Sequence, residues 1–152
     1  MSHFLRTILN PLHRKEILER FERLDSAHAP RWGRMTAPHM LVHLCDQMRM
    51  PFNDKPSGRI PGVPTNRILK HLVLYVLPWP KGIIQGPPEA FLTEPGNWAD
   101  DLAALRELVD RFVNAPPQRS WPDHPNFGRM SRRAWGVFCY RHFDHHLRQF
   151  GA

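Results

Sequence analysis

Apolar residues recur every three or four positions in five segments of the chain, which is the spacing of an amphipathic helix, and no segment alternates strictly between apolar and polar residues. The first segment predicts a helix over about residues 11–27, with Asn10 as its N-terminal cap. The second predicts a helix that begins after the cap Thr36 and runs to about Met50, where a proline stops it.

The other three segments complete an all-helical plan. A short and very apolar helix begins near Pro64 and ends before Pro78. Asn97 caps the next helix, which carries two aspartates in its first turn, and Ser131 caps the last helix. We therefore expect a single domain over residues 1–152, an all-α four-helix bundle with long crossover loops and one extra short helix.

Composition narrows the class of protein. With 152 residues, of which 41% are hydrophobic, the chain is long enough for a sizeable core. Its longest apolar run is interrupted by Lys70 and His71 and predicts no membrane helix. The net charge of +7 comes from arginines spread along the chain, so we expect neither nucleic acid nor a membrane as a partner. Two cysteines, Cys45 and Cys139, are too few for a disulfide scaffold; with no recognisable signal peptide, they indicate a cytoplasmic protein with reduced thiols.

The last predicted helix carries three histidines within five positions, in the sequence RHFDHHLRQF. A helix turns by about 100° per residue, so residues three or four apart share a face. The face that carries Trp135 and Phe138 continues to His142 and, one turn later, to His145 and His146. Two imidazoles four residues apart on one helix face can ligate one metal ion. The apolar periodicity alone does not choose between His145 and His146. Nor does it separate metal ligands from hydrogen-bonded structural histidines.

A third imidazole is available on the second predicted helix. His43 lies between Met40, Leu44 and Gln47 on the inward side, and His39 precedes it by one turn. A bundle can bring this helix against the last one, so that three nitrogens meet at one ion. Three protein ligands and an open position are typical of reactive metal sites, and imidazole ligands suit zinc, nickel, copper or iron without identifying the metal.

Two stretches of the sequence are similar to signatures of a known superfamily. The stretch RWGRMTAPHMLVHLCDQM resembles the W-G-x-M…M-L-x-H-L pattern of the DinB-like superfamily of metal-binding bundles. The stretch HPNFGRMSRRAWGVFCYRHFDHHLRQFG is similar to HP-x-FG…W…H-x-x-x-H-x-x-Q-FG, the C-terminal signature of one uncharacterised branch of that superfamily.

This resemblance implies a DinB-like bundle with one divalent transition metal ion, for which zinc and nickel are the leading candidates. It implies His43, His142 and His146 as the ligands, and it thereby selects His146 over His145. It also implies a homodimer. His39 stands where the superfamily usually has a non-ligand polar residue, and a fourth histidine would close the site; we expect three ligands.

The candidates for catalytic roles are His124, His145 and Asp46. His124 either faces the site as a proton donor or substrate contact, or belongs to a turn that docks Phe127; we favour the turn. Asp46 and Asp144 can orient a ligand imidazole through its second nitrogen, although we expect Asp144 to face solvent.

The function that we expect is that of a metal-dependent enzyme acting on a small molecule. Its metal would activate either a water, as in a hydrolase, or a small thiol, as in a transferase. The alternative is a non-catalytic metal-binding or interaction protein that uses the bundle as a scaffold.

Overall fold

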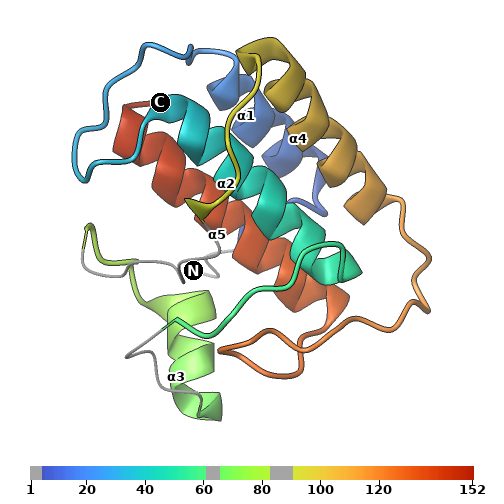
Figure 1. Ribbon diagram of the computed structural model, residues 1–152. Coiled ribbons are helices and arrows are strands. Elements are labelled where there is room, and N and C mark those ends of the chain that lie inside the picture. Colours follow the sequence, from blue (N-terminus) through green and yellow to red (C-terminus); the bar gives the residue numbers. More distant parts are fainter. Residues whose placement is uncertain (1–4, 61–65, 83–90) are drawn as a thin grey trace.

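The computed structural model describes residues 5–60, 66–82 and 91–152. Within these ranges the regular structure is helical, apart from one isolated bridge between His124 and Gly128 (Figure 1). The elements are α1 (Pro11–Phe21), α2 (Ala37–Arg49), the 3-10 turn η1 (Met50–Phe52), α3 (Arg67–His71), the π-helical turn η2 (Leu72–Val76), α4 (Trp98–Val113) and α5 (Arg132–Phe150). The predicted all-helical class is confirmed.

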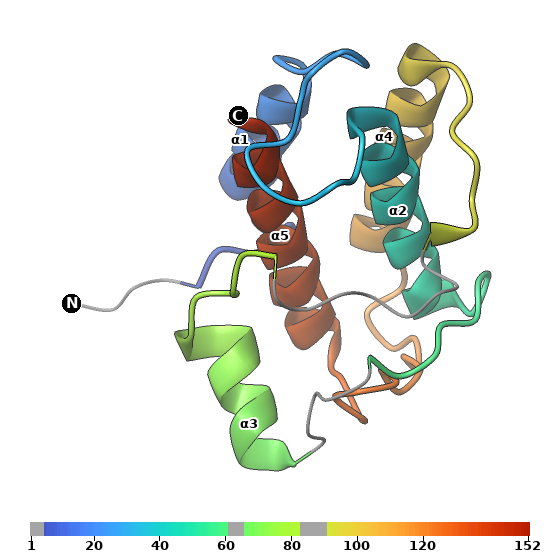
Figure 2. The ribbon, with the colours of Figure 1, turned by 60° about the vertical axis from the view of Figure 1, so that its left-hand side comes forward.

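Four longer helices pack as two pairs in the described part of the chain. Helix α4 packs on α2, and α1 packs on α5. The α2–α5 contact joins the pairs, so these two helices lie side by side in the centre (Figures 1 and 2). Helix α3 and η2 lie beside this bundle, with η2 against α5. None of the described helices has the length and hydropathy needed to cross a bilayer.

The helix starts follow the predicted caps. In each case the side-chain oxygen of the cap accepts backbone N–H groups that have no partner within the helix. The caps are Asn10 for α1, Thr36 for α2, Asn97 for α4 and Ser131 for α5.

Helix α1 is shorter than predicted. It ends at Phe21, and the prediction of a helix to residue 27 is wrong. Leu24 is still buried, at 6% exposure, so the apolar spacing continues beyond the helix. The Asp25 carboxylate accepts the backbone N–H of Ala27 at 2.8 Å, and this local turn competes with a further helical turn.

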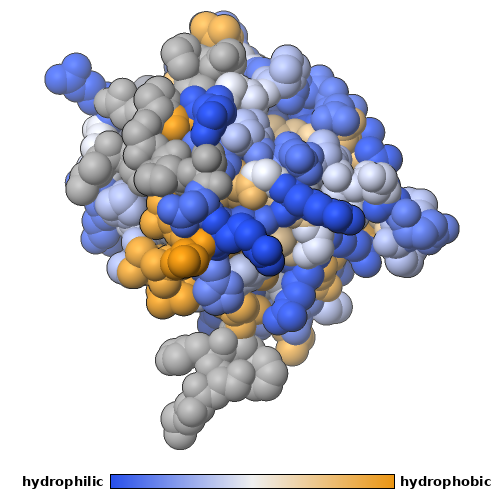
Figure 3. All heavy atoms as spheres, turned by 90° about the horizontal axis from the view of Figure 1, so that it is seen from below, coloured by the Kyte–Doolittle hydropathy of each residue, from blue (hydrophilic) through white to orange (hydrophobic). Residues whose placement is uncertain are grey.

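The short apolar helix changes its geometry midway. Asn66 caps it, and the predicted start near Pro64 lies outside the described residues. From Leu72 the backbone becomes π-helical, and the N–H of Leu77 donates to the carbonyl of Leu72 at 2.8 Å. Seen from the α3 end of the molecule, apolar side chains gather on part of the surface (Figure 3), and Ile68 and Val76 are exposed.

Helix α5 is buried along most of its length. Phe143 meets Phe21 of α1 edge to face, with ring centroids 5.6 Å apart. The prediction that Asp144 faces solvent is wrong: its side chain is 23% exposed and pairs with Arg20 at 2.7 Å and with Arg148 at 3.0 Å. The reason is that α1 covers this side of α5.

Gly136 lets the N-terminal segment lie directly on α5. Its carbonyl accepts the N–H of Ile8 at 3.2 Å, and a Cβ at this position would lie 2.6 Å from Oγ1 of Thr7 and 3.0 Å from Cγ of Leu9. Alanine normally stabilises a helix interior by about 1 kcal/mol over glycine. Here we expect Gly136→Ala to lower the free energy of unfolding by about 1–3 kcal/mol, because the methyl group overpacks this contact. Urea denaturation measures the change.

The Thr7→Ala/Gly136→Ala double variant is the matched control. It removes the closest clashing atom and should recover part of the lost stability relative to Gly136→Ala alone. An increase in stability for Gly136→Ala would contradict the close contact.

Candidate metal centre

Three histidines from two helices meet at the α2–α5 contact. His43 comes from α2, and His142 and His146 come from successive turns of α5. Nε2 of His142 lies 3.1 Å from Nε2 of His43 and 3.1 Å from Nε2 of His146. Around a tetrahedral ion with metal–nitrogen bonds of about 2.0–2.1 Å, two ligand nitrogens are roughly 3.3 Å apart. The three side chains thus lie within reach of a single ion.

Gln149 determines which nitrogen of His146 faces the other two histidines. Its Nε2 donates to the carbonyl of Trp32 at 2.9 Å, so its Oε1 faces Nδ1 of His146 at 2.8 Å. An amide oxygen only accepts, so Nδ1 of His146 carries the proton and Nε2 offers a lone pair. Gly33 permits the approach: its φ is +78°, and a Cβ there would lie 3.0 Å from Nε2 of Gln149.

Burial keeps the imidazoles of His142 and His146 uncharged. Burial, with His43 nearby, lowers the pKa of His146 to about 3. Burial, together with His146 and His43, holds the pKa of His142 well below its ordinary value. Neutral imidazole is the form that ligates a metal, so both side chains of α5 are in the ligating state at neutral pH.

Protons alone do not satisfy this cluster. Nε2 of His146 carries a lone pair. Nε2 of His142 therefore either donates a hydrogen bond to it, or the two nitrogens face each other with their lone pairs. One proton on His142 cannot make a full hydrogen bond to both neighbours, and Nδ1 of His142 is buried without a partner among the described residues. A divalent cation would accept all three lone pairs. The donor chemistry therefore fits a metal ion.

A large cavity adjoins the three histidines. Its volume is about 890 Å³, and its walls come from α2, α5, α3 with η2 and the intervening loops. Phe91 stacks on His43, with parallel rings whose centroids are 5.7 Å apart. The aromatic residues of the wall are Trp32, Trp79, Phe91, Phe127 and Phe138. A small molecule in this cavity would therefore reach the three histidines.

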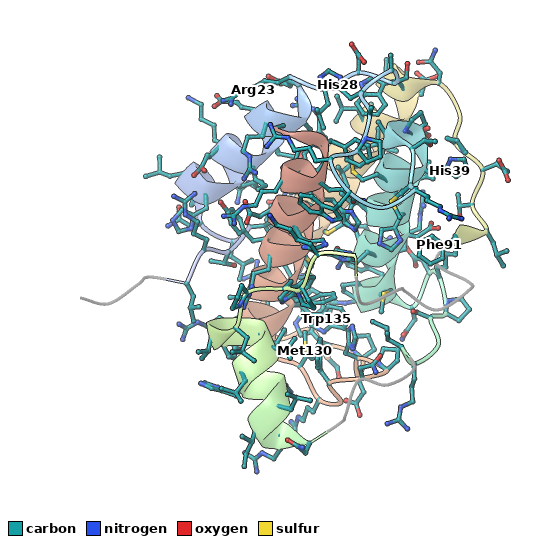
Figure 4. The ribbon with its side chains drawn as sticks, turned by 90° about the vertical axis from the view of Figure 1, so that its left-hand side faces the viewer. Arg23, His28, His39, Phe91, Met130 and Trp135 are labelled. Carbon is teal, nitrogen blue, oxygen red and sulfur yellow. The ribbon has the colours of Figure 1, made fainter. Side chains whose placement is uncertain are left out.

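The other two histidines near the cluster take different places. Nδ1 of His39 lies 2.8 Å from Oγ1 of Thr36, and its Nε2 lies 3.9 Å from Glu94, so it is not among the three convergent ligands (Figure 4). The ring of His145 lies between Trp32 and Trp79, at centroid distances of 5.9 Å and 6.0 Å, and lines the cavity. Burial lowers its pKa from the ordinary value.

Asp46 ties loops to α2. Arg49 donates to its carboxylate at 2.8 Å, and Lys55 and Thr93 bind the second oxygen. Burial opposes ionisation of this carboxyl group, but the hydrogen bonds from Lys55, Thr93 and Arg49 outweigh it and hold the pKa below its ordinary value. The structure thus gives Asp46 a role in holding loops, in place of the predicted role of orienting a ligand imidazole. No sequence pattern pointed to Lys55 or Thr93, because both lie in irregular loops.

His124 forms the predicted turn and also lines the cavity. Its Nδ1 accepts the backbone N–H groups of Asn126 and Phe127, at 3.1 Å and 3.3 Å. Its ring stacks on Phe127 with centroids 4.6 Å apart. The turn interpretation is therefore confirmed, and the position at the cavity wall makes a ligand contact available as well.

The two cysteines are free and buried. Sγ of Cys139 accepts a hydrogen bond from Nε2 of Gln47 at 3.2 Å. Burial raises the pKa of the Cys139 thiol to about 12. Burial raises the pKa of the Cys45 thiol to about 12 as well. Both thiols stay protonated at neutral pH and pack as small apolar groups.

Comparison with known proteins gave one family match, which covers part of the chain. A model of a family described as a protein of unknown function, DUF1569, matches residues 84–152, less than half of the chain. The match includes α5 and thus His142 and His146, but not His43. No curated protein and no solved structure gave a significant match to the chain.

The Gln149 contact predicts the tautomer of His146. In metal-free protein at pH 7, ¹⁵N NMR of the imidazole should find Nδ1 of His146 protonated and Nε2 unprotonated. In Gln149→Leu, which removes the accepting oxygen, this preference should weaken. Protonation of Nε2 in the unsubstituted protein would contradict the assigned role of Gln149.

Buried His124 predicts loss of stability in acid. Burial and nearby Lys70 lower its pKa from 6.5 to about 4. Between these values the unfolded chain binds a proton that the folded protein does not, so the free energy of unfolding falls as the pH decreases from about 6.5 to about 4. The contribution of His124 is on the order of 3 kcal/mol. Urea unfolding of metal-free protein at several pH values measures it.

His124→Asn should reduce this pH dependence, because Asn does not titrate and its oxygen can accept the same backbone N–H groups. His71→Asn, at an exposed position, is the control and should leave most of the pH dependence in place. An unchanged slope in His124→Asn would rule out the assigned contribution.

Proposed function

We propose that the protein binds one divalent transition metal ion through Nε2 of His43, His142 and His146, and that it is a metal-dependent enzyme of the DinB-like type. The observation that carries the proposal is the convergence of three imidazole nitrogens, in 3.1 Å steps, beside a large cavity. When bound there, zinc or nickel supplies Lewis acidity and lowers the pKa of a water or a thiol.

The residues of the chain divide the remaining tasks. The α2–α5 contact presents the ligands, and Gln149 holds His146 in the ligating tautomer. The cavity admits a small molecule and a water or thiol to the ligands. His145 and His124 line its wall and are the groups best placed to contact a substrate.

The cavity favours a reactive site over a closed one. Structural zinc sites are usually enclosed by four protein ligands, whereas reactive sites combine three with an open position. The described residues bring three candidate ligands together, and His39 points elsewhere. The resemblance to the DinB-like stretches supports the same reading, because those stretches contain His43, His142 and His146.

Metal analysis of protein purified without a histidine tag tests this proposal. We expect uptake of about one equivalent of zinc or nickel, and at least about a tenfold loss of affinity in each of His43→Ala, His142→Ala and His146→Ala. His39→Ala and His145→Ala are matched controls that should retain binding. Less than about a tenth of an equivalent after addition of either metal would refute a site of this type. Loss in His145→Ala with retention in His146→Ala would refute the ligand assignment.

Cobalt-loaded protein then separates a reactive site from a closed one. Addition of 2-mercaptoethanol should produce a new near-ultraviolet charge-transfer band if a thiol reaches an open position. A bound cobalt ion whose spectrum does not respond to thiol would favour the non-catalytic alternative.

A further inference from the structure

The cavity beside the three histidines has a mainly apolar wall. Besides its aromatic residues, Met35, Met50, Ile60, Leu69 and Val73 line it. Its volume of about 890 Å³ lies within the range of small-molecule sites, which is roughly 300–1,000 Å³. The wall therefore suits a ligand that buries apolar surface.

The charged groups at this cavity do not form an anion site. Lys55 is bound to Asp46 and Thr93, so its charge is neutralised within the wall. Arg34, the remaining basic side chain among the lining residues apart from histidines, is exposed to solvent. Among the described lining residues, no buried arginine is available to hold a phosphate ester. The ligand class is accordingly uncharged or weakly polar.

His124 contributes one oriented hydrogen-bond donor to this wall. Two backbone N–H groups donate to its Nδ1, so in the neutral ring the proton is on Nε2. No described residue accepts a hydrogen bond from Nε2. His124 is buried, at 4% exposure, and lines the cavity. A ligand atom with a lone pair would satisfy this donor.

We propose that the cavity binds an uncharged, mainly apolar small molecule with one hydrogen-bond acceptor, such as a carbonyl oxygen, and that Nε2–H of His124 holds this acceptor. This inference rests on the proposed function in one respect, since it names the class of ligand for the same site. His124 thereby acts as a specificity-determining residue. It selects, among apolar molecules, those that present an acceptor.

Two fluorescent probes test the proposal in metal-free protein. The first is 6-propionyl-2-(dimethylamino)naphthalene, which is neutral, apolar and carries one ketone; the second is diphenylhexatriene, which has no acceptor. We expect saturable binding of the ketone probe with blue-shifted emission. His124→Asn keeps an acceptor for the turn but removes the Nε2–H group. It should lower the affinity for the ketone probe by roughly three- to tenfold. Its effect on diphenylhexatriene should be below twofold, about the error of the titration.

Trp79→Ala serves as a second variant, because it removes an apolar side chain from the cavity wall and leaves His124 in place. It should lower the affinity for both probes. Circular dichroism and thermal unfolding check that each variant is folded. Absence of saturable binding of the ketone probe would overturn the proposal. So would an equal effect of His124→Asn on both probes, or no effect on either. The probe titrations contain no metal, so they test the ligand class separately from the metal site. Binding of the ketone probe by a protein that takes up no metal would refute the proposed function and leave the ligand class standing. Metal uptake by a protein that does not bind the ketone probe would overturn the ligand class and leave the metal site standing.

Discussion

The contact between α2 and α5 is the interaction on which the candidate metal centre depends. His43 and His142 are far apart in the sequence, and only this packing places their Nε2 atoms 3.1 Å apart. Burying polar rings costs free energy unless each finds a partner, so the apolar residues around them must supply the stability that the cluster lacks. Helix α5 does so through Phe143 and Trp135, which are almost fully buried. The core thus holds together a set of nitrogens that protons alone do not satisfy.

Gln149 connects this helix contact to the loop before α2. Its amide spans the carbonyl of Trp32 and Nδ1 of His146, and the N–H of Arg31 donates to its backbone carbonyl at 2.6 Å. The loop therefore positions a ring nitrogen on α5, and in return α5 holds Trp32 at the cavity wall. Gly33 makes this possible, because a side chain at its positive φ would be strained and would approach the amide. One glutamine thus links the orientation of the His146 ring to the position of Trp32 in the cavity wall.

Sequence periodicity predicted the helices because caps and apolar stripes are local properties. Thr36 and Ser131 act as caps at the predicted positions. Periodicity failed at Leu24, because this residue keeps helical spacing although it lies in a turn after α1. It also failed to predict the π-helical geometry from Leu72, which does not change the spacing of the apolar residues. In the site, the stripe placed His142 inward, but the choice of His146 came from the family resemblance. The partners of Asp46 could not be predicted, because loop residues meet only through the tertiary fold.

Burial has two opposed effects at this centre. It lowers the pKa of His142 and His146, so protons do not compete with a metal at neutral pH. The same burial costs stability in the metal-free protein, since Nδ1 of His142 loses hydration without gaining a partner among the described residues. A cation that binds the folded state would recover this free energy, because ligand binding to the native state alone shifts the folding equilibrium toward it. Folding thus meets the cost of burying the cluster, and Gln149 orients one lone pair, on Nε2 of His146, toward the position between the three rings.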